Sequence, residues 1–194
     1  NAVTFQRGTT NVTLNGTDGS GNNATACSFS VTINDNVAPT LSGVPANVTI
    51  NCNQSIPTPP SVAGNDNCSG VTVNMTTTTS TVGCSFITTR TWTATDAAGN
   101  TATGVQTITQ IDNQAPTFGT APTTVSASGC GSSVSLNLTT FISDNGCSGT
   151  VTVSNTRTGA SADASGVYPN GTTTVVFTAT DACGNSKTHS VVVN

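Results

Sequence analysis

A ten-residue segment occurs three times in this chain, and its repetition constrains the fold more than any other feature. The copies are TWTATDAAGN at 91–100, VFTATDACGN at 176–185 and TLNGTDGSGN at 13–22. Other landmarks recur in the same order, since Asp35 and Asp112 are 77 residues apart and Cys52 and Cys130 are 78 apart. A fixed period of this length is typical of a tandem array of similar structural units.

The landmarks predict where the repeats begin and end. Two whole repeats of about 80 residues are expected, at 37–113 and 114–194. Residues 1–36 are interpreted as the C-terminal part of a truncated repeat, contributing its last two or three strands. We therefore expect one partial and two complete copies of the same small domain.

Composition and patterning predict an all-β fold. The chain contains 41 Thr among 194 residues and no Glu, a bias toward strand formers and away from helix formers. Strands are expected near 47–52, 71–78, 86–95 and 102–111. Several short strands separated by turn signals in each repeat indicate tandem immunoglobulin-like β-sandwiches.

Alternation within the strand at 86–95 assigns its two faces. Side chains of a strand point to opposite faces in turn, so Phe86, Trp92 and Ala94 share one face, which we expect to be the core face. Arg90 interrupts that face, and we place it near a strand end.

The recurring segment is interpreted as a hairpin turn and not as a reactive site. Asp96 can accept hydrogen bonds from backbone N–H groups two or three residues on, and Gly99 can adopt a positive φ. Asn100 tolerates similar conformations. The alternative, in which Asp96 and Asp181 are metal ligands or general bases, is less favoured because the repetition of the fold already explains these residues.

Charge and residue content exclude several functional classes. The net charge is −4 with only four basic residues, which argues against nucleic acid and against an anionic membrane surface. No apolar run approaches the ~20 residues of a membrane span. The single histidine, His189, lies in a strand-like segment without triad partners, so we predict that the chain is not an enzyme.

The seven cysteines suggest an oxidising, extracellular setting. Cys52 and Cys68 are 16 residues apart, and Cys130 and Cys147 occupy the matching positions 17 apart. We pair them as Cys52–Cys68 and Cys130–Cys147. Buried reduced thiols are the alternative, and a zinc site is less favoured because the chain has one histidine and no CxxC motif.

Several motifs resemble the HYR (hyalin repeat) family of immunoglobulin-like domains. They are TWTATDAAGN, VFTATDACGN and DNCSG, and the longer run NVTINCNQSIPTPPSVAGNDNCSG is similar to repeats of very long secreted surface proteins and adhesins of bacteria. The resemblance covers nearly the whole chain. It implies an extracellular β-sandwich array used for adhesion or as a stalk, with no catalytic residues to carry over.

The resemblance also bears on the three remaining cysteines. Similar repeats often join a cysteine just before the TRTWTATD strand to the one inside TDACGN. Cys84 has the first position but Ala98 occupies the second, and Cys183 has the second position without a partner in its own repeat. Cys84 and Cys183 are expected first to be free and buried, with pairing between repeats or cross-linking of neighbouring chains as alternatives. Cys27 would find any partner outside residues 1–194.

The run NDNVAP at 34–39 resembles the calcium-binding linkers between cadherin domains. Asp35 and Asp112 stand at the two repeat junctions, and Asp18 and Asp96 could approach them from the turns. Calcium needs six to eight oxygen ligands, and this chain lacks the Glu residues of cadherin sites. We favour a turn followed by a proline-stiffened linker, and keep calcium bound at these four Asp residues as the alternative.

The sequence thus predicts a structural or adhesive segment of a large secreted cell-surface protein, a stalk, filament or adhesin. Its expected partners are neighbouring repeats of the same chain and further copies in a homo-oligomeric or filament assembly. The alternative is a non-catalytic accessory or ligand-binding module of a secreted multidomain protein, and a ligand-binding module would need an exposed aromatic patch.

Overall fold

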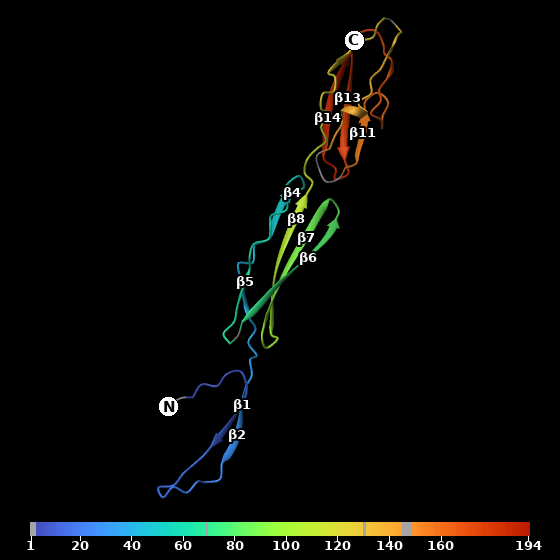
Figure 1. The fold of residues 1–194 in the computed structure, drawn as a ribbon. Coiled ribbons are helices and arrows are strands. Elements are labelled where there is room, and N and C mark those ends of the chain that lie inside the picture. Colours follow the sequence, from blue (N-terminus) through green and yellow to red (C-terminus); the bar gives the residue numbers. More distant parts are fainter. Residues whose placement is uncertain (1–2, 69, 130, 145–148) are drawn as a thin grey trace. The chain divides into compact units, whose positions relative to one another are not determined.

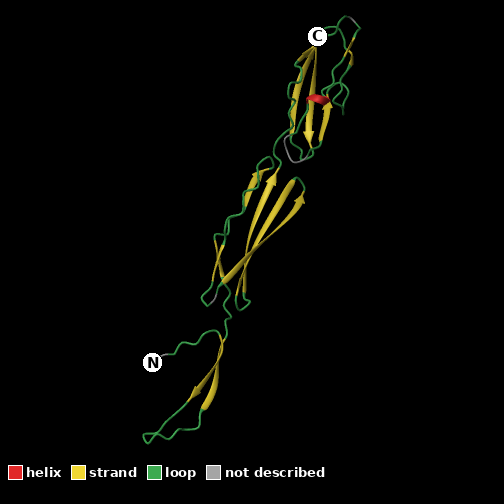
Figure 2. Cartoon of the chain, in the orientation of Figure 1, coloured by secondary structure: helices red, strands yellow, loops and turns green. Residues whose placement is uncertain are grey.

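The computed structural model describes residues 3–68, 70–129, 131–144 and 149–194. These residues form strands joined by turns and loops, with one 3-10 turn at Thr139–Phe141 (Figure 2). No helix in the described ranges is long and apolar enough to cross a membrane. The all-β fold class is therefore confirmed.

The first element is an antiparallel hairpin, drawn in blue in Figure 1. Strand β1 (Gly8–Leu14) pairs with β2 (Cys27–Ile33), from Gly8 opposite Ile33 to Leu14 opposite Cys27. Hydroxyl side chains line the hairpin, as where Thr9 and Thr32 hydrogen bond at 3.0 Å. Its larger apolar side chains, among them Leu14 and Phe29, are exposed.

The central part of the chain forms two sheets. Its strands are β3 (Thr40–Ser42), β4 (Val48–Asn51), β5 (Ala63–Asn65), β6 (Val71–Val82), β7 (Ser85–Asp96) and β8 (Thr101–Ile111). The larger sheet has the order β4-β8-β7-β6, and β3 pairs with β5 in the smaller one. Strand β4 runs parallel to β8, with Val48 opposite Ile108 and Asn51 opposite Ile111.

Close packing joins the two sheets. Gly104 of β8 lies so near β3 and the segment after it that a Cβ built on it would come within 2.7 Å of Val44 and 3.3 Å of Leu41. A glycine in a strand interior often marks such a close approach of two segments. The central part is therefore a two-layered sandwich.

Strand β7 confirms the predicted alternation and corrects two residues. Trp92 and Ala94 are buried, as expected, and every second residue from Thr88 to Asp96 is buried with them. Phe86 is 42% exposed, so the prediction that it faces the core is wrong. Arg90 is buried in mid-strand, not near an end, because its guanidinium has a partner there: it donates to Oε1 of Gln106 at 3.3 Å.

The last part of the chain repeats the order of the larger sheet. Its strands are β9 (Thr124–Val125), β10 (Ser133–Val134), β11 (Val151–Asn155), β12 (Gly166–Val167), β13 (Thr173–Asp181) and β14 (Ser186–Val193). The sheet reads β11-β13-β14-β9, with β9 again parallel to β14. The two four-stranded sheets therefore have the same strand order. In this comparison β4 corresponds to β9, β8 to β14, β7 to β13 and β6 to β11.

A compact hydrophobic core fills this last sandwich. Phe177, Ala179 and Val191 are fully buried on β13 and β14. They pack against Leu136 and Leu138, which follow β10. The residues of the four-stranded sheet and of the opposite layer thus form one core, as an immunoglobulin-like sandwich requires.

By contacts the chain separates into two compact units. One comprises Asn1–Pro45, Pro59–Thr76 and Arg90–Gln106, and the other comprises Ala46–Thr58, Thr77–Thr89 and Thr107–Asn194. The repeat boundaries at 36/37 and 113/114 rest on sequence landmarks and stay a prediction.

Substitution of Phe177 tests the core. Phe177→Ala removes a fully buried aromatic ring and should lower the free energy of unfolding by about 3–5 kcal/mol, measured by urea denaturation. Val167→Ala, at a position 57% exposed, is the matched control and should change it by less than about 0.5 kcal/mol. Equal effects of the two substitutions would contradict the assigned core.

Candidate functional site

The recurring segment forms the same tight turn in all three copies. In residues 96–100, Oδ1 of Asp96 accepts the N–H groups of Ala98 at 2.8 Å and Asn100 at 2.9 Å. Oδ2 accepts the side-chain amide of Asn100 at 2.8 Å, and Gly99 has a φ of 92°. The turn interpretation is confirmed, with one change: the second backbone donor is four residues on, not three.

The copies at 181–185 and 18–22 use equivalent bonds. Oδ1 of Asp181 accepts the N–H groups of Cys183 and Asn185, and Oδ2 accepts the Asn185 amide. Asp18 binds the N–H groups of Ser20 and Asn22 and the Asn22 amide in the same way. A short polar side chain that satisfies two backbone donors and one side-chain donor fixes each turn.

Two of the turns also hold the chain segment that precedes their own sandwich. Nδ2 of Asn100 donates to the carbonyl oxygen of Asp35 at 3.1 Å, and Nδ2 of Asn185 donates to that of Asp112 at 3.3 Å. The same hydrogen bond, from the asparagine at the end of the turn, therefore links each of these two hairpin tips to the Asp-Asn run before its repeat. We call these runs, Asn34–Asn36 and Ile111–Asn113, the junction segments.

Each of these turns gathers three carboxylates. In one trio, Asp35, Asp66 and Asp96 each place an oxygen within 4.8 Å of one another. In the other, Asp112, Asp144 and Asp181 do the same. We call these groups the first and second aspartate trios. Each combines a junction segment, the loop before β6 or β11, and a hairpin tip.

The junction aspartates carry oxygens that nothing in the described protein satisfies. Asp112 is only 9% exposed, its Oδ1 accepts the Gln114 N–H at 3.2 Å, and its Oδ2 is buried without a hydrogen bond. Oδ2 of Asp35 is likewise buried without one, while its Oδ1 accepts the Val37 N–H. A buried carboxylate oxygen without a partner is costly, and is an unusual feature of a purely structural turn.

Hydrogen bonds keep the turn aspartates ionised. Burial by itself would raise the pKa of Asp96, but the side chain and N–H of Asn100 and the N–H groups of Ala98 and Gly99 outweigh it. The pKa of Asp96 therefore lies below 3.8, and the same balance lowers the pKa of Asp181. Both are negatively charged at neutral pH.

The structure regroups the aspartates predicted as calcium ligands. Asp35 and Asp96 meet in the first trio and Asp112 belongs to the second, but Asp18 joins neither among the described residues. Sequence reasoning did not propose Asp66 or Asp144 as ligands, and it considered Asp181 only in the less favoured alternative of a metal ligand or general base in the turn. A signal was present, because Asp66 and Asp144 are 78 residues apart and lie in the similar motifs NDNCSG and DNGCSG.

The disulfides differ from those predicted. Cys84, in the loop between β6 and β7, is bonded to Cys183 in the turn between β13 and β14, with Cα atoms 5.6 Å apart. The first expectation, that both are free, is wrong, and the alternative of pairing between repeats is confirmed. Their lack of a partner in their own repeats is explained, because each supplies half of one bond.

The predicted pair Cys52–Cys68 is also wrong. Cys52 is disulfide-bonded, whereas Cys68 is an exposed free thiol, as is Cys27. Cys52 follows β4 and donates its N–H to Ile111, the last residue of β8, while Cys68 donates its N–H to Asp66. Equal spacing in two repeats marks equivalent positions and does not identify partners.

Cys130 and Cys147 lie outside the described residues, so their pairing stays a prediction.

His189 has a structural environment. It lies half-buried on β14, where Nε2 is 2.8 Å from the carbonyl oxygen of Pro122 and the ring stacks on Phe118 at 5.1 Å. The prediction of a strand histidine is confirmed, although the side chain is less exposed than expected.

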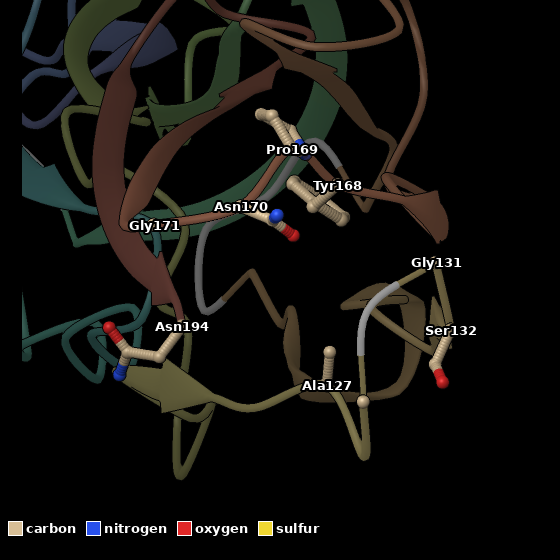
Figure 3. Close-up of a pocket in the computed structure, with 9 residues that line it drawn as sticks. Ala127, Gly131, Ser132, Tyr168, Pro169, Asn170, Gly171 and Asn194 are labelled. Atoms are coloured by element: carbon tan, nitrogen blue, oxygen red, sulfur yellow. The ribbon is translucent and has the colours of Figure 1, made fainter.

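The last sandwich has a hollow of about 290 Å³. Tyr168, Asn170 and Asn194 are among the residues that line it (Figure 3). The Tyr168 hydroxyl donates to the carbonyl oxygen of Ala164 at 2.6 Å, and the Arg157 guanidinium covers its ring at 4.4 Å. Both the polar end and one face of this aromatic side chain are therefore already engaged. The hollow does not offer the exposed aromatic platform that a ligand-binding module would need.

The family comparison agrees with the motifs. Residues 40–110 match the family described as HYR-like domain with 4 cysteines, so the predicted resemblance is confirmed for this part of the chain. The matched residues contain three cysteines, Cys52, Cys68 and Cys84, with Ala98 in the hairpin turn. No curated protein matches the sequence.

Solved structures of cadherin ectodomains are similar at low levels. The protocadherin GammaB4 extracellular domain has 14% identity and a TM-score of 0.38, with 95% of this chain and 37% of that chain covered. Drosophila N-cadherin EC1-4 has 13% identity and a TM-score of 0.40, with 97% and 58% covered. Human desmocollin-1 has 12% identity and a TM-score of 0.32, with 96% and 46% covered. This chain spans less than two thirds of each, and similarities this low do not bear on function.

The Cys84–Cys183 bond can be tested chemically. Peptide mapping without reduction should recover Cys84 linked to Cys183, while Cys27 and Cys68 react with iodoacetamide in the folded protein. A double Cys84→Ser/Cys183→Ser variant should lose about 4–5 kcal/mol of stability, the chain-entropy value for a loop of this length. Cys27→Ser is the control. Recovery of Cys84 as a free thiol would contradict the pairing.

The turn aspartates predict acid sensitivity. Because the folded pKa of Asp181 is lowered, its stabilising contribution is complete above the unfolded value near 3.8 and is lost as pH falls through the folded value. The free energy of unfolding should fall between about pH 5 and pH 2, and Asp181→Asn should flatten this slope. Lys187→Gln, which removes no carboxylate, is the control and should leave the slope unchanged. An unchanged slope in Asp181→Asn would contradict the assignment.

Proposed function

We propose, from the premise that residues 40–110 are an HYR-like domain within a tandem array, that this chain is a structural and adhesive segment of a large secreted cell-surface protein. The proposed role is mechanical: the array extends outward from the cell and bears load, as a stalk, filament or adhesin does. Its partners are neighbouring repeats of its own chain and further copies of the protein.

One observation carries the proposal: the disulfide between Cys84 and Cys183, 99 residues apart. It connects the loop between β6 and β7 to the hairpin tip of the last sandwich. A covalent bond at this place carries tension directly from one predicted repeat to the next, so that pulling on the chain does not unfold the intervening 98 residues. The disulfide also supports an extracellular location, because structural disulfides persist in oxidising compartments.

The surface chemistry also supports a structural role. The large aromatic side chains Trp92, Phe118 and Phe177 are buried in the sandwiches, and Tyr168 is covered by Arg157. Binding modules for sugars or peptides usually present exposed aromatic anchors with a few placed polar groups. Phe29 and Phe86 are exposed on two different strands, β2 and β7, and the exposed strands otherwise carry mainly Thr and Ser hydroxyls.

Pulling the chain from its two ends tests whether it can bear tension. Under oxidising conditions the Cys84–Cys183 bond, between residues 99 apart in sequence, shields the segment between them from extension. Reduction should therefore lengthen the fully extended chain by on the order of 30 nm or more, measured by single-molecule force spectroscopy. If the fully extended length were the same with and without reductant, the proposal that the disulfide bears tension would be contradicted.

The cellular role is tested by locating the protein. Antibodies against residues 1–194 should label the surface or extracellular material of intact cells, and the complete gene should encode further repeats of the same period. A catalytic domain joined to only these few repeats would instead favour the accessory-module alternative. Labelling only after permeabilisation would contradict an extracellular array.

A further inference from the structure

We propose that each aspartate trio binds one calcium ion, giving two sites in residues 1–194. The first is formed by Asp35, Asp66 and Asp96, and the second by Asp112, Asp144 and Asp181. The proposal is independent of the cellular role, since it concerns only what these side chains bind.

The donor set favours a hard divalent cation. Each trio offers only carboxylate oxygens, which suit calcium and magnesium, whereas zinc and copper favour imidazole or thiolate. Two hollows adjoin the first trio, one lined by Asp35 with Asn34 and Asn36, the other by Asp66 with Asn65 and Asn67. Amide and carbonyl oxygens here can supplement the carboxylates toward the six to eight oxygens that calcium takes.

The second and independent observation is the unsatisfied oxygen of Asp112. The side chain is nine-tenths buried, its Oδ1 is occupied by the Gln114 N–H, and its Oδ2 has no hydrogen bond. Three carboxylates held within 4.8 Å repel one another, and burial strengthens that repulsion. A cation bound between the three carboxylates would coordinate Oδ2 of Asp112 and would also offset the repulsion among them.

The third observation is that the arrangement occurs twice. The trios use equivalent repeat positions, and in both the junction aspartate has a buried oxygen without a hydrogen bond, Oδ2 of Asp35 and Oδ2 of Asp112. The third copy of the turn provides an internal contrast. Asp18 makes the same three hydrogen bonds as Asp96 and Asp181, yet belongs to no trio in the described part of the chain. The turn alone therefore does not form a trio, which also needs a junction aspartate and an aspartate from the loop before β6 or β11.

A bound ion would fasten each junction segment to the sandwich that follows it. The Asn100 and Asn185 side chains already hold the junction carbonyls by single hydrogen bonds. At the second trio the turn is also anchored by the Cys84–Cys183 disulfide, but Ala98 occupies the equivalent place beside the first. Calcium should therefore protect residues 34–36 from proteolysis more strongly than residues 111–113.

Calorimetric titration of calcium chloride into the chelator-treated full chain tests the sites. Two ions should bind, with dissociation constants on the order of 10⁻⁴–10⁻³ M, the range of extracellular modules. Asp35→Asn and Asp112→Asn should each leave one ion, because Asn keeps the Oδ1 acceptor and removes the charge. Asp18→Asn is the matched control and should still bind two.

A second measurement separates binding from folding. Circular dichroism confirms that each variant is folded, and Asp144→Asn replaces Asp112→Asn if that variant does not fold. Calcium should raise the melting temperature of the wild type, with a smaller effect of magnesium at equal concentration, and should not raise that of Asp35→Asn/Asp112→Asn. Absence of calcium binding up to 10 mM, or two ions in a folded Asp112→Asn or Asp144→Asn variant, would overturn the proposal.

Discussion

The hydrogen bonds from one aspartate side chain to its own turn are the interaction on which the rest of the structure depends. Asp96 and Asp181 each accept two backbone N–H groups and one asparagine amide, and this fixes the tip of the hairpin that forms the middle of each larger sheet. The same asparagine then reaches the junction carbonyl. One short motif thus closes a hairpin and holds the chain entering the sandwich, which explains why it recurs so faithfully.

Two further features are built on this fixed turn. The Cys183 N–H is one of the two that Asp181 binds, so the turn positions the sulfur that bonds to Cys84. A carboxylate oxygen of Asp96 and one of Asp181 each lie within 4.8 Å of oxygens from two more aspartates. Structural and ligand-binding roles are therefore not alternatives at these residues, because the hydrogen bonds that shape the turn also hold a charged oxygen at a defined place.

Features with a local cause could be predicted from the sequence, and features with a long-range cause could not. The turn, the strands at 71–78 and 86–95 and the burial of Trp92 follow from residue type and period-two alternation. The exposure of Phe86 and the burial of Arg90 depend on what the opposite layer provides, including Gln106. The partner of Cys84 lies 99 residues away, and a repeat period shows which positions are equivalent without showing which ones touch.

Amide hydrogen exchange by NMR tests the central claim most directly, because it reports the bonds that Asp181 makes. The N–H groups of Cys183 and Asn185 should exchange slowly in the wild type and faster in Asp181→Ala, while the core strand residue Val191 stays protected in both. Rapid exchange of Cys183 and Asn185 in the folded wild type would contradict the account, since the turn would then not be fixed by its aspartate.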